Sequence, residues 1–523
     1  MWRDTPGERK TRYEEILSRS PFFYEAAKKT ENFREHIYTD AREAMKSAKG
    51  RKPADLMKSR AADGAAAVSK AIETTVTDYV IAPMLHAFVL WVLHSAMENG
   101  HKRLYFLARD GYLMYNTAVR MCRDIGIPVD CRYLYCSRYS IRVPMYHLDM
   151  DETLDYICRG GMDLTLKRIL DRSGLTAEQI SGFADKLTEQ RAFWQLPGLT
   201  GAAGENQSPE NIHISHAALA GLRQLLSELP GFTEAVAENS GSKMEAAAGY
   251  LTQEGLRDDI PYAIVDSGWV GSMQKVLGQL LQKDDMEGYY WGLYELPQDV
   301  DPDSYHCYYF TPGEGLKRKV DFANCLFEAI FSAPHGMTLS YEKKPDLESA
   351  PESGRGKTFS YEGSRTYIPV LAEIDNEYRL FIKREEMRLE RYTRHVIDMV
   401  RRAYPPPEKD FRYTVRKLLR LFMSCPTEEE ARIYGNFPFS DDVLEYSGRL
   451  AADLTQQELA ANHLCRKSLA MMGIGRGVHR ESGWYEASAV MAGTRINKHL
   501  RGYRRYKTLL YISTAYRKQR STR

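Results

Sequence analysis

The chain has 523 residues, of which 43% are hydrophobic and 27% charged, and its formal net charge is +2. This is the composition of a soluble globular protein with room for two or three domains, and it gives no reason to expect a nucleic-acid partner. Eight cysteines without a CxxC pair predict reduced thiols, and the N-terminus has no apolar signal-peptide core, so we expect a cytoplasmic protein.

The first 102 residues predict helices. Residues 1–75 are charged and rich in alanine, and we interpret them as a helical N-terminal region. The segment 79–97 is the most apolar of the chain, but its uninterrupted apolar part is shorter than the roughly 20 residues that a membrane span requires. We therefore expect a buried helix that starts at Pro83.

The pattern changes at Arg103. The apolar run LYFLA, the helical spacing of residues 111–126 and the second apolar run CRYLYC predict a strand, a helix and a strand, as in a βαβ unit. Residues 151–256 are polar and helical in pattern, and we interpret them as an inserted helical subdomain. Strand patterns return at YAIVDSGWVGSMQKVLGQLL (262–281), GYYWGLYEL and YHCYYF. Residues 76–345 therefore predict an α/β core with a mostly parallel, Rossmann-like sheet.

The last third of the chain predicts a separate helical region. Residues 346–365 are poor in large apolar side chains and are interpreted as a linker, and residues 366–523 as a helical C-terminal domain with a basic tail. The tail, RGYRRYKTLLYISTAYRKQRSTR, has no acidic residue. It is compatible with a solvated tail or with a helix that rests on anionic lipid at the inner membrane face.

Two loops carry the chemistry that the sequence suggests. In a parallel sheet, the loops after the strands form the ligand crevice, and helices that begin there direct N–H groups into it. The first loop supplies a cation, a carboxylate and a glycine in Arg109, Asp110 and Gly111. The second loop supplies a carboxylate, hydroxyls, tight turns and an exposed aromatic ring, in Asp266, Ser267, Gly268, Trp269, Gly271, Ser272 and Gln274. Together the loops predict a site for a phosphorylated ligand.

Other common site types are not indicated by the sequence. No GxxxxGK[ST] string lies near either loop, and HExxH, GxSxG and zinc-like Cys/His spacings do not occur.

The strand ending in Arg-Asp-Gly, the strand ending in CSR at 136–138 and the later IVDSGWVGS resemble the phosphoribosyltransferase fold. The resemblance implies that Arg109, Asp110 and Gly111 lie at pyrophosphate, with Ser137 and Arg138 nearby. It implies that Asp266 faces the ribose hydroxyls, that the small-residue loop holds the 5-phosphate, and that Asp110 and Asp266 hold Mg²⁺. The family usually has two adjacent acids at the strand end, and Ser267 takes the second place here.

FLARDGYLM, YLYCSR, VDSGWVGSMQ and FEAIFSAPHG are similar to bacterial capsule and surface-polysaccharide proteins that are often described as haloacid-dehalogenase-like. The resemblance covers about residues 79–341. It implies a glycosyltransferase that moves ribose-5-phosphate from phosphoribosyl pyrophosphate to a saccharide or polyol hydroxyl, with a lipid-linked glycan as one kind of acceptor. A true phosphatase domain precedes this region in several such proteins, so a separate phosphatase is an expected partner here.

A third motif, FEAIFSAPHGMTLSY, contributes Glu328 and His335 as candidate catalytic groups beside Asp266. One would serve as the general base for the acceptor and another would stabilise the developing oxocarbenium charge. Ordinary structural roles remain open for all of these residues: an ion pair or helix cap for Arg109 and Asp110, packing for Trp269, and a turn for His335.

Two alternative functions remain open. One is a phosphate-binding or assembly module for polysaccharide enzymes that does not turn over, because Ser267 replaces an acid. The other is a haloacid-dehalogenase-like hydrolase, whose nucleophilic Asp would stand at the position of Ala108; an alanine methyl cannot form an aspartyl-phosphate.

Overall fold

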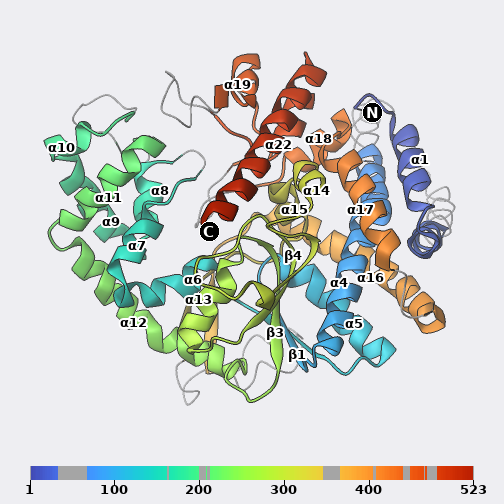
Figure 1. The fold of residues 1–523 in the computed structure, drawn as a ribbon, viewed down its shortest axis with the longest axis horizontal. Coiled ribbons are helices and arrows are strands. Elements are labelled where there is room, and N and C mark those ends of the chain that lie inside the picture. Colours follow the sequence, from blue (N-terminus) through green and yellow to red (C-terminus); the bar gives the residue numbers. More distant parts are fainter. Residues whose placement is uncertain are drawn as a thin grey trace, which may run out of the picture.

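The protein folds around one five-stranded sheet (Figure 1). The computed structural model describes residues 2–32, 67–161, 164–199, 208, 212–344, 366–403, 408–439, 448–464, 466–467 and 480–521. The predicted linker 346–365 and residues 33–66 of the predicted N-terminal region lie outside the described residues, as do the last two residues of the basic tail.

The sheet confirms the predicted α/β class, because all of its neighbouring strands run parallel in the order β2-β1-β3-β4-β5. Its strands are β1 (Arg103–Leu107), β2 (Asp130–Leu134), β3 (Tyr262–Trp269), β4 (Glu287–Leu293) and β5 (Tyr305–Phe310). The helices α5 (Gly111–Ile125) and α13 (Ser272–Leu281) follow β1 and β3, as the sequence predicts. The strands β1, β3, β4 and β5 are mostly apolar and aromatic, which is typical of strands covered on both faces, whereas the edge strand β2 is partly exposed.

Side chains alternate along β1 and enter two different cores. Leu104 and Phe106 join a cluster that includes α5 and α4 (Ala82–Glu98), whereas Tyr105 and Leu107 join a cluster that includes α13 and α12 (Phe232–Gln253). The period-2 alternation of a strand produces this division. The sheet is therefore covered on both faces, and the loops lie at its carboxyl edge.

The apolar helix starts earlier than the sequence predicts. Helical structure runs from Ala67 to Glu98, with a π-helical turn at Thr77–Ile81 immediately before α4. Pro83 lies in the first turn of α4, next to that irregular turn, where a missing backbone N–H is tolerated. The helix is long and apolar enough to span a membrane by length and composition, and 78% of its most apolar window is buried inside the protein.

The predicted insertion forms a lobe on one side of the sheet (Figure 1). It has a core of its own, built by side chains such as Leu170, Phe183, Leu222 and Phe232. Its helices are α6 (Arg138–Arg142), α7 (Met150–Ile157), α8 (Leu166–Asp171), α9 (Ala177–Thr188), α10 (Arg191–Trp194), α11 (Leu219–Glu228) and α12. The long helix α12 returns the chain to the sheet and leads into β3.

The chain after the sheet begins with two short helices, and a strand pair that the sequence did not predict follows them. The helices are α14 (Leu316–Val320) and α15 (Asn324–Ile330), and β6 (Thr338–Lys343) pairs antiparallel with β7 (Tyr367–Leu371). The predicted helical C-terminal domain thus opens with a strand. Its helices are α16 (Asn376–Ala403), α17 (Glu408–Met423), α18 (Glu428–Gly435), α19 (Gln456–Ala461), α21 (Tyr485–Met491) and α22 (Ile496–Ser521).

The C-terminal helices pack on the N-terminal ones. The pair α1 (Pro6–Leu17) and α17 are in contact, as are the pairs α5–α16 and α4–α17. Figure 1 shows these helices together on the side of the sheet opposite the inserted lobe. One continuous hydrophobic cluster includes side chains from α1, α4, the sheet, α16 and α17, so both ends of the chain cover the same face.

Candidate functional site

The strand order creates a switch point between β1 and β3. The chain leaves β1 toward β2 on one side, and it continues through β3 to β4 and β5 on the other side. In a doubly wound sheet of this order, the loops at the carboxyl ends of the two central strands diverge and leave room for a ligand. The two loops that the sequence singles out are the loops at this point.

Asp266 and Ser267 lie at the end of β3, as the sequence predicts, and the strand continues beyond them to Trp269. The ladder between β1 and β3 ends at Phe106 and Val265, whereas the ladder between β3 and β4 continues to Trp269 and Leu293. Asp266 is thus the first residue of β3 beyond the part that pairs with β1. β3 extends beyond its pairing with β1 because its end pairs only with β4, whereas the chain after β1 turns away from β3 at Ala108.

Asp110, Ser267 and Asp266 form the centre of the candidate site. The Ser267 hydroxyl, which is buried, donates a hydrogen bond to Asp110 Oδ2. Asp110 precedes α5 at the N-cap position but makes no side-chain capping bond. The structure therefore answers one of the open alternatives: the Asp110 carboxylate is turned toward β3 and does not cap its own helix.

Both carboxyl groups have raised pKa values. Burial raises the pKa of Asp266 to about 7, and the negative charge of Asp110 adds to this effect. Burial also raises the pKa of Asp110, against the hydrogen bond from Ser267 and the positive charges of Arg109 and Arg138. Acids with shifted pKa values that lie together at a strand end are candidates for a functional site.

Two arginines place positive charge around these acids. The charge of Arg138 lowers the pKa values of both Asp110 and Asp266, and the charge of Arg109 lowers that of Asp110. Arg138 is exposed at the start of α6, and Ser137 caps that helix while its hydroxyl donates to the Thr338 carbonyl at 2.6 Å. Ser137 thus has a structural role, and Arg138 contributes charge to the site.

Asp110 and Asp266 are the two carboxylates at this site that could contact a divalent cation. Among the described residues, no group of three or more His, Cys, Asp or Glu side chains could hold a metal ion. Mg²⁺ commonly uses one or two carboxylates and completes its octahedron with water and substrate phosphate oxygens. Asp110 and Asp266 fit this pattern, so their side chains would hold the cation against a phosphorylated substrate.

The helices α5 and α13 begin next to these acids. Gly111 opens α5 so close to β1 that a Cβ on it would lie 3.0 Å from the carbonyl carbon of Phe106. Gly271 is the N-cap of α13, with φ 68°, and Ser272 is the first residue of that helix. Helix N-termini attract anions through their unpaired N–H groups and dipoles, so a phosphate group has two favourable places here.

Trp269 adopts an unusual backbone conformation. Its φ is 73°, which a bulky side chain rarely accepts, and its indole N–H donates to Glu328 Oε1 at 2.5 Å. The ring packs near Phe322 and Phe327, at centroid distances of 5.4 and 5.6 Å. Left-handed backbone at a non-glycine residue is a recurrent feature of binding sites. Glu328 is thereby a partner of Trp269, which the sequence did not predict.

His335 lies among aromatic rings beside Arg109. Its Nδ1–H donates to the Gly336 carbonyl at 2.8 Å, and its Nε2 accepts from the Tyr133 hydroxyl at 2.9 Å. Burial lowers the pKa of His335, and the charge of Arg109 lowers it further, so the imidazole is neutral at pH 7. Tyr135, at a ring-centroid distance of 4.9 Å, and Tyr133 belong to this neighbourhood and were missed because they look like ordinary strand aromatics.

Gln274, like Ser137, is a predicted site residue whose side chain the structure directs to a structural role. It is buried in α13, where its amide nitrogen donates to the Met286 carbonyl and to Ser304, and its amide oxygen accepts from Tyr290. The side chain joins α13 to β4 and β5. Its amide group is occupied by the protein, so it is a structural residue.

A scan of the chain against protein-family models finds no match, and a search of curated proteins finds no significant match.

Proposed function

We propose that the protein is a glycosyltransferase of surface-polysaccharide biosynthesis that transfers ribose-5-phosphate from phosphoribosyl pyrophosphate to a saccharide or polyol hydroxyl. The observation that carries the proposal is the pair Asp110 and Asp266 at the switch point, with Arg109 and Arg138 around it. A pyrophosphate bound with Mg²⁺ offers both the cation that the acids need and the anion that the arginines need. The two helix N-termini support a second phosphate group.

In the proposed reaction, the bond between ribose C1 and the pyrophosphate oxygen breaks, and a bond from the acceptor oxygen to C1 forms. Mg²⁺ would neutralise charge on the departing pyrophosphate. Arg109 and Arg138 bind that group, and the Asp266 carboxylate stabilises the positive charge that develops on the ribose. The acceptor hydroxyl loses its proton to a general base.

His335 is the better candidate for that base. Its imidazole is neutral and its Nε2 accepts from the Tyr133 hydroxyl at 2.9 Å, so Tyr133 would take the proton of the acceptor hydroxyl as it passes its own proton to Nε2. Glu328 is engaged with the Trp269 indole at 2.5 Å, which suits a role in orienting that ring. A ring held in this way can stack on an acceptor sugar. The product keeps its 5-phosphate, so a separate phosphatase would act after it.

The binding module without turnover is the second candidate. Ser267 donates its hydroxyl proton to Asp110, in the place where a second acid would otherwise add a carboxylate. An incomplete acid set can retain a ligand without catalysing its reaction. The hydrolase has less support, because Ala108 stands at the position of the nucleophile and its side chain has no nucleophilic atom.

Calorimetry with phosphoribosyl pyrophosphate and Mg²⁺ tests the proposal. We expect binding by the unaltered protein and a loss of at least about 30-fold in affinity in Arg109→Ala and in Asp266→Asn, since each variant removes a charged contact worth about 2 kcal/mol. The matched controls are Arg123→Ala and Asp285→Asn, whose side chains are 66% and 81% exposed near the opposite edge of the sheet.

The same proteins then distinguish the candidates. Release of pyrophosphate with a saccharide acceptor supports the transferase, and binding without release supports the binding module. An unaltered protein that does not bind the donor, or controls that lose affinity as much as the two site variants, would contradict the phosphoribosyl proposal.

A further inference from the structure

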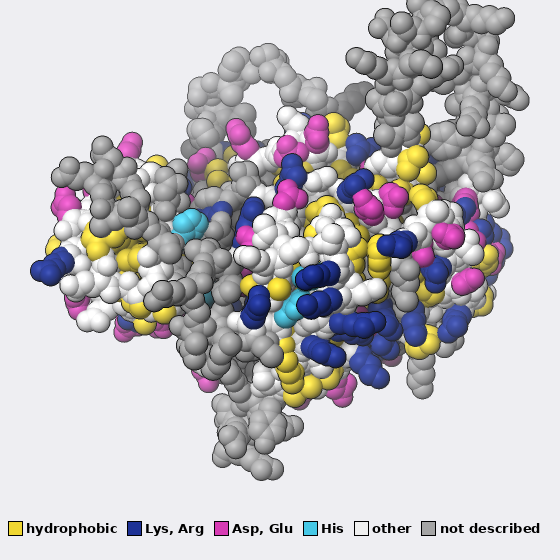
Figure 2. Space-filling view, turned by 90° about the horizontal axis from the view of Figure 1, so that it is seen from above, with side chains coloured by type: hydrophobic (Ala, Val, Ile, Leu, Met, Phe, Trp, Pro, Cys, Tyr) yellow, Lys and Arg dark blue, Asp and Glu magenta, His cyan; other side chains and the backbone are white. Residues whose placement is uncertain are grey.

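The helix α22 presents an outer face that combines positive charge with apolar side chains. Arg501, Arg505, Leu509 and Ile512 follow one another at helical spacing, and we call them the outer face of α22. Both arginines are exposed, and Leu509 and Ile512 are each 45% exposed. Figure 2 views the side of the molecule on which α22 lies in Figure 1, and it shows Lys and Arg side chains gathered there beside apolar ones.

The opposite face of α22 is firmly packed. The Tyr503 ring stacks on Tyr485 at 4.0 Å, and Lys507 donates to the Phe322 carbonyl at 2.7 Å. Arg504 pairs with the buried Asp321 at 2.8 Å. The helix is thus held to the body of the protein through one side, and the side chains of the outer face are exposed.

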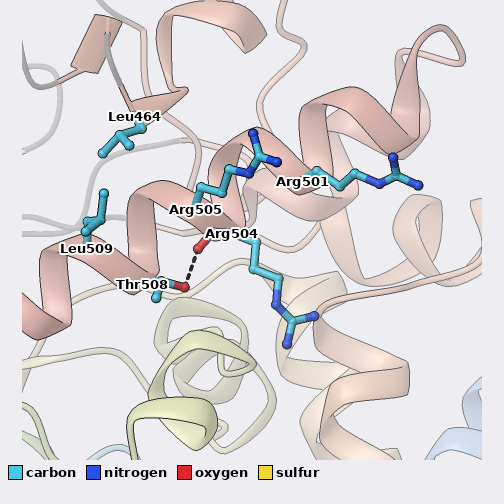
Figure 3. A pocket seen from close by; sticks show the side chains of 6 residues that line it. All are labelled: Leu464, Arg501, Arg504, Arg505, Thr508 and Leu509. Atoms are coloured by element: carbon cyan, nitrogen blue, oxygen red, sulfur yellow. Dashed lines mark hydrogen bonds between the residues drawn. The ribbon is translucent and has the colours of Figure 1, made fainter.

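A cavity of about 440 Å³ lies along this helix, lined by Leu464, Arg501, Arg504, Arg505, Thr508 and Leu509. Figure 3 shows Leu509 extending from α22 toward Leu464, Arg505 extending from the same side of the helix, and Arg504 extending from the other side. Guanidinium groups beside leucine side chains match a phosphate group attached to an apolar body. This is the chemistry of an anionic lipid headgroup at the boundary of its acyl chains.

All the charged side chains of α22 are positive. No acidic residue follows Glu486 in the sequence, so α22 carries only positive and neutral side chains. Arginine and lysine near an anionic bilayer each contribute about 1 kcal/mol of attraction, and exposed apolar side chains between them enter the headgroup layer. A nucleic acid would use the charge but has no use for Leu509 and Ile512.

The helix also adjoins the candidate site. The Tyr511 ring stacks on Tyr294 at 5.1 Å and 12°, and Tyr294 lies 6.0 Å from Trp269. Trp269 is the residue at the end of β3 whose indole is held by Glu328. A membrane that binds the outer face of α22 would therefore lie on the side of the sheet where the candidate site opens.

We propose that the outer face of α22 docks the protein on a membrane that contains anionic lipid, and that this docking directs the carboxyl edge of the sheet toward an acceptor carried by a membrane lipid. The second half of this statement rests on the proposed function, and the docking itself does not. The occupant is a phospholipid surface, because the face pairs clustered arginines with protruding aliphatic side chains.

Co-sedimentation with vesicles tests the docking. We expect the full-length protein to bind vesicles of phosphatidylcholine with about 30% phosphatidylglycerol and to bind pure phosphatidylcholine vesicles far less, with binding reduced by added salt. Arg501→Glu combined with Arg505→Glu should lower the partition coefficient more than about 25-fold, since each lost charge alone accounts for about fivefold. Leu509→Ser combined with Ile512→Ser should lower it by about tenfold or more.

The matched control is Lys102→Glu combined with Arg123→Glu. These two exposed residues lie immediately before β1 and at the end of α5, at the amino edge of the sheet. The control has the same net charge as the arginine variant and should bind as the unaltered protein does. Equal loss in the control, or equal binding to both kinds of vesicle, would overturn the proposal.

A competition between vesicles and nucleic acid tests the identity of the partner. Tighter binding of the unaltered protein to a short RNA or DNA than to the anionic vesicles would assign the face to nucleic acid instead.

A circular-dichroism melt verifies the fold of each variant, and the serine variant tests the same face if the glutamate variant is unstable. Calorimetry with phosphoribosyl pyrophosphate on the glutamate variant separates the two proposals, because loss of docking should leave donor binding unchanged.

Discussion

At the scale of single residues, the candidate site is an arrangement in which charge is costly until a ligand arrives. Asp266 and Asp110 are both driven toward their neutral forms by burial, and each makes the charge of the other less favourable. Ser267 supplies a hydroxyl donor to Asp110, and Arg138 supplies a positive charge to both acids. A bound cation would reverse the balance, because it favours the two carboxylates over the neutral acids.

Asp266→Asn is expected to stabilise the protein at high pH. The pKa of Asp266 is raised to about 7 in the folded protein and is about 4 in the unfolded chain. The protonated carboxyl therefore contributes fully to the free energy of unfolding below pH 4, and this contribution is lost as the pH rises through 7. Asparagine does not titrate, so the free energy of unfolding of the variant should exceed that of the unaltered protein by about 1–3 kcal/mol above pH 8. Near pH 4 the two free energies of unfolding should be almost equal. Urea denaturation at a series of pH values measures the difference.

Asp285→Asn is the control, since its carboxylate is 81% exposed, and it should show no such pH dependence. Mg²⁺ with pyrophosphate should stabilise the unaltered protein at pH 8 and not Asp266→Asn. A variant that is less stable than the unaltered protein at pH 8 would refute the raised pKa of Asp266.

At the scale of elements, the site depends on β3 continuing past β1 alongside β4. Gly268 is the residue that permits the close approach of β3 and β4. Its φ is 111°, and a Cβ on it would lie 2.5 Å from the Gly292 carbonyl oxygen. Trp269 and Gly271 also have left-handed backbone, so the chain reaches α13 through three such residues in four. The backbone of β4 therefore determines where Trp269 and the N-terminus of α13 lie.

Gly268→Ala is expected to destabilise the protein by about 2–4 kcal/mol, because the new methyl group meets backbone that cannot rotate away and the φ is unfavourable for alanine. Gly313→Ala is the control, because a Cβ on Gly313 has no atom within 4 Å and its φ is ordinary. Thermal melting of the two variants measures the contrast. Similar melting temperatures would show that β3 can shift away from β4 without cost.

At the scale of the whole molecule, the two ends of the chain are joined through a buried ion pair. Arg9 of α1 contacts Glu430 of α18 at 2.8 Å, and its guanidinium also donates to the Leu421 carbonyl at 2.9 Å. The Tyr13 hydroxyl donates to the same Glu430 at 2.6 Å. Because the surrounding apolar cluster also includes the sheet, the N-terminal helix, the sheet and the C-terminal helices should unfold together.

Glu430→Gln is expected to cost about 2–4 kcal/mol, since it leaves the buried Arg9 cation without its nearest charged partner. Circular dichroism during urea denaturation should show one transition for helix α1 and the sheet, displaced to lower urea. Glu428→Gln, at a 53% exposed pair with Arg432, should change stability by less than about 0.5 kcal/mol. An unchanged midpoint in Glu430→Gln would show that this pair does not hold α1 in place.

Several features followed from the sequence because they depend on local pattern. The apolar runs at LYFLA and YAIVD, each followed by a helical period, predicted β1, α5, β3 and α13, and the parallel α/β class with them. The same reasoning predicted that Arg109, Asp110 and Asp266 would meet, because parallel strands bring their carboxyl ends to one edge. Alternation and helical spacing are properties of neighbouring residues, so one chain is enough to read them.

Tertiary structure decided what depends on distant parts of the chain. Gln274 turned toward β4 and β5 because its amide found partners there, and Glu328 became the partner of Trp269 because α15 packs against the end of β3. The pairing of β6 with β7 and the shared core of α1, α4 and α17 join segments that are far apart in sequence. No local pattern encodes such contacts, because burial and hydrogen bonding choose among partners only once the chain has folded.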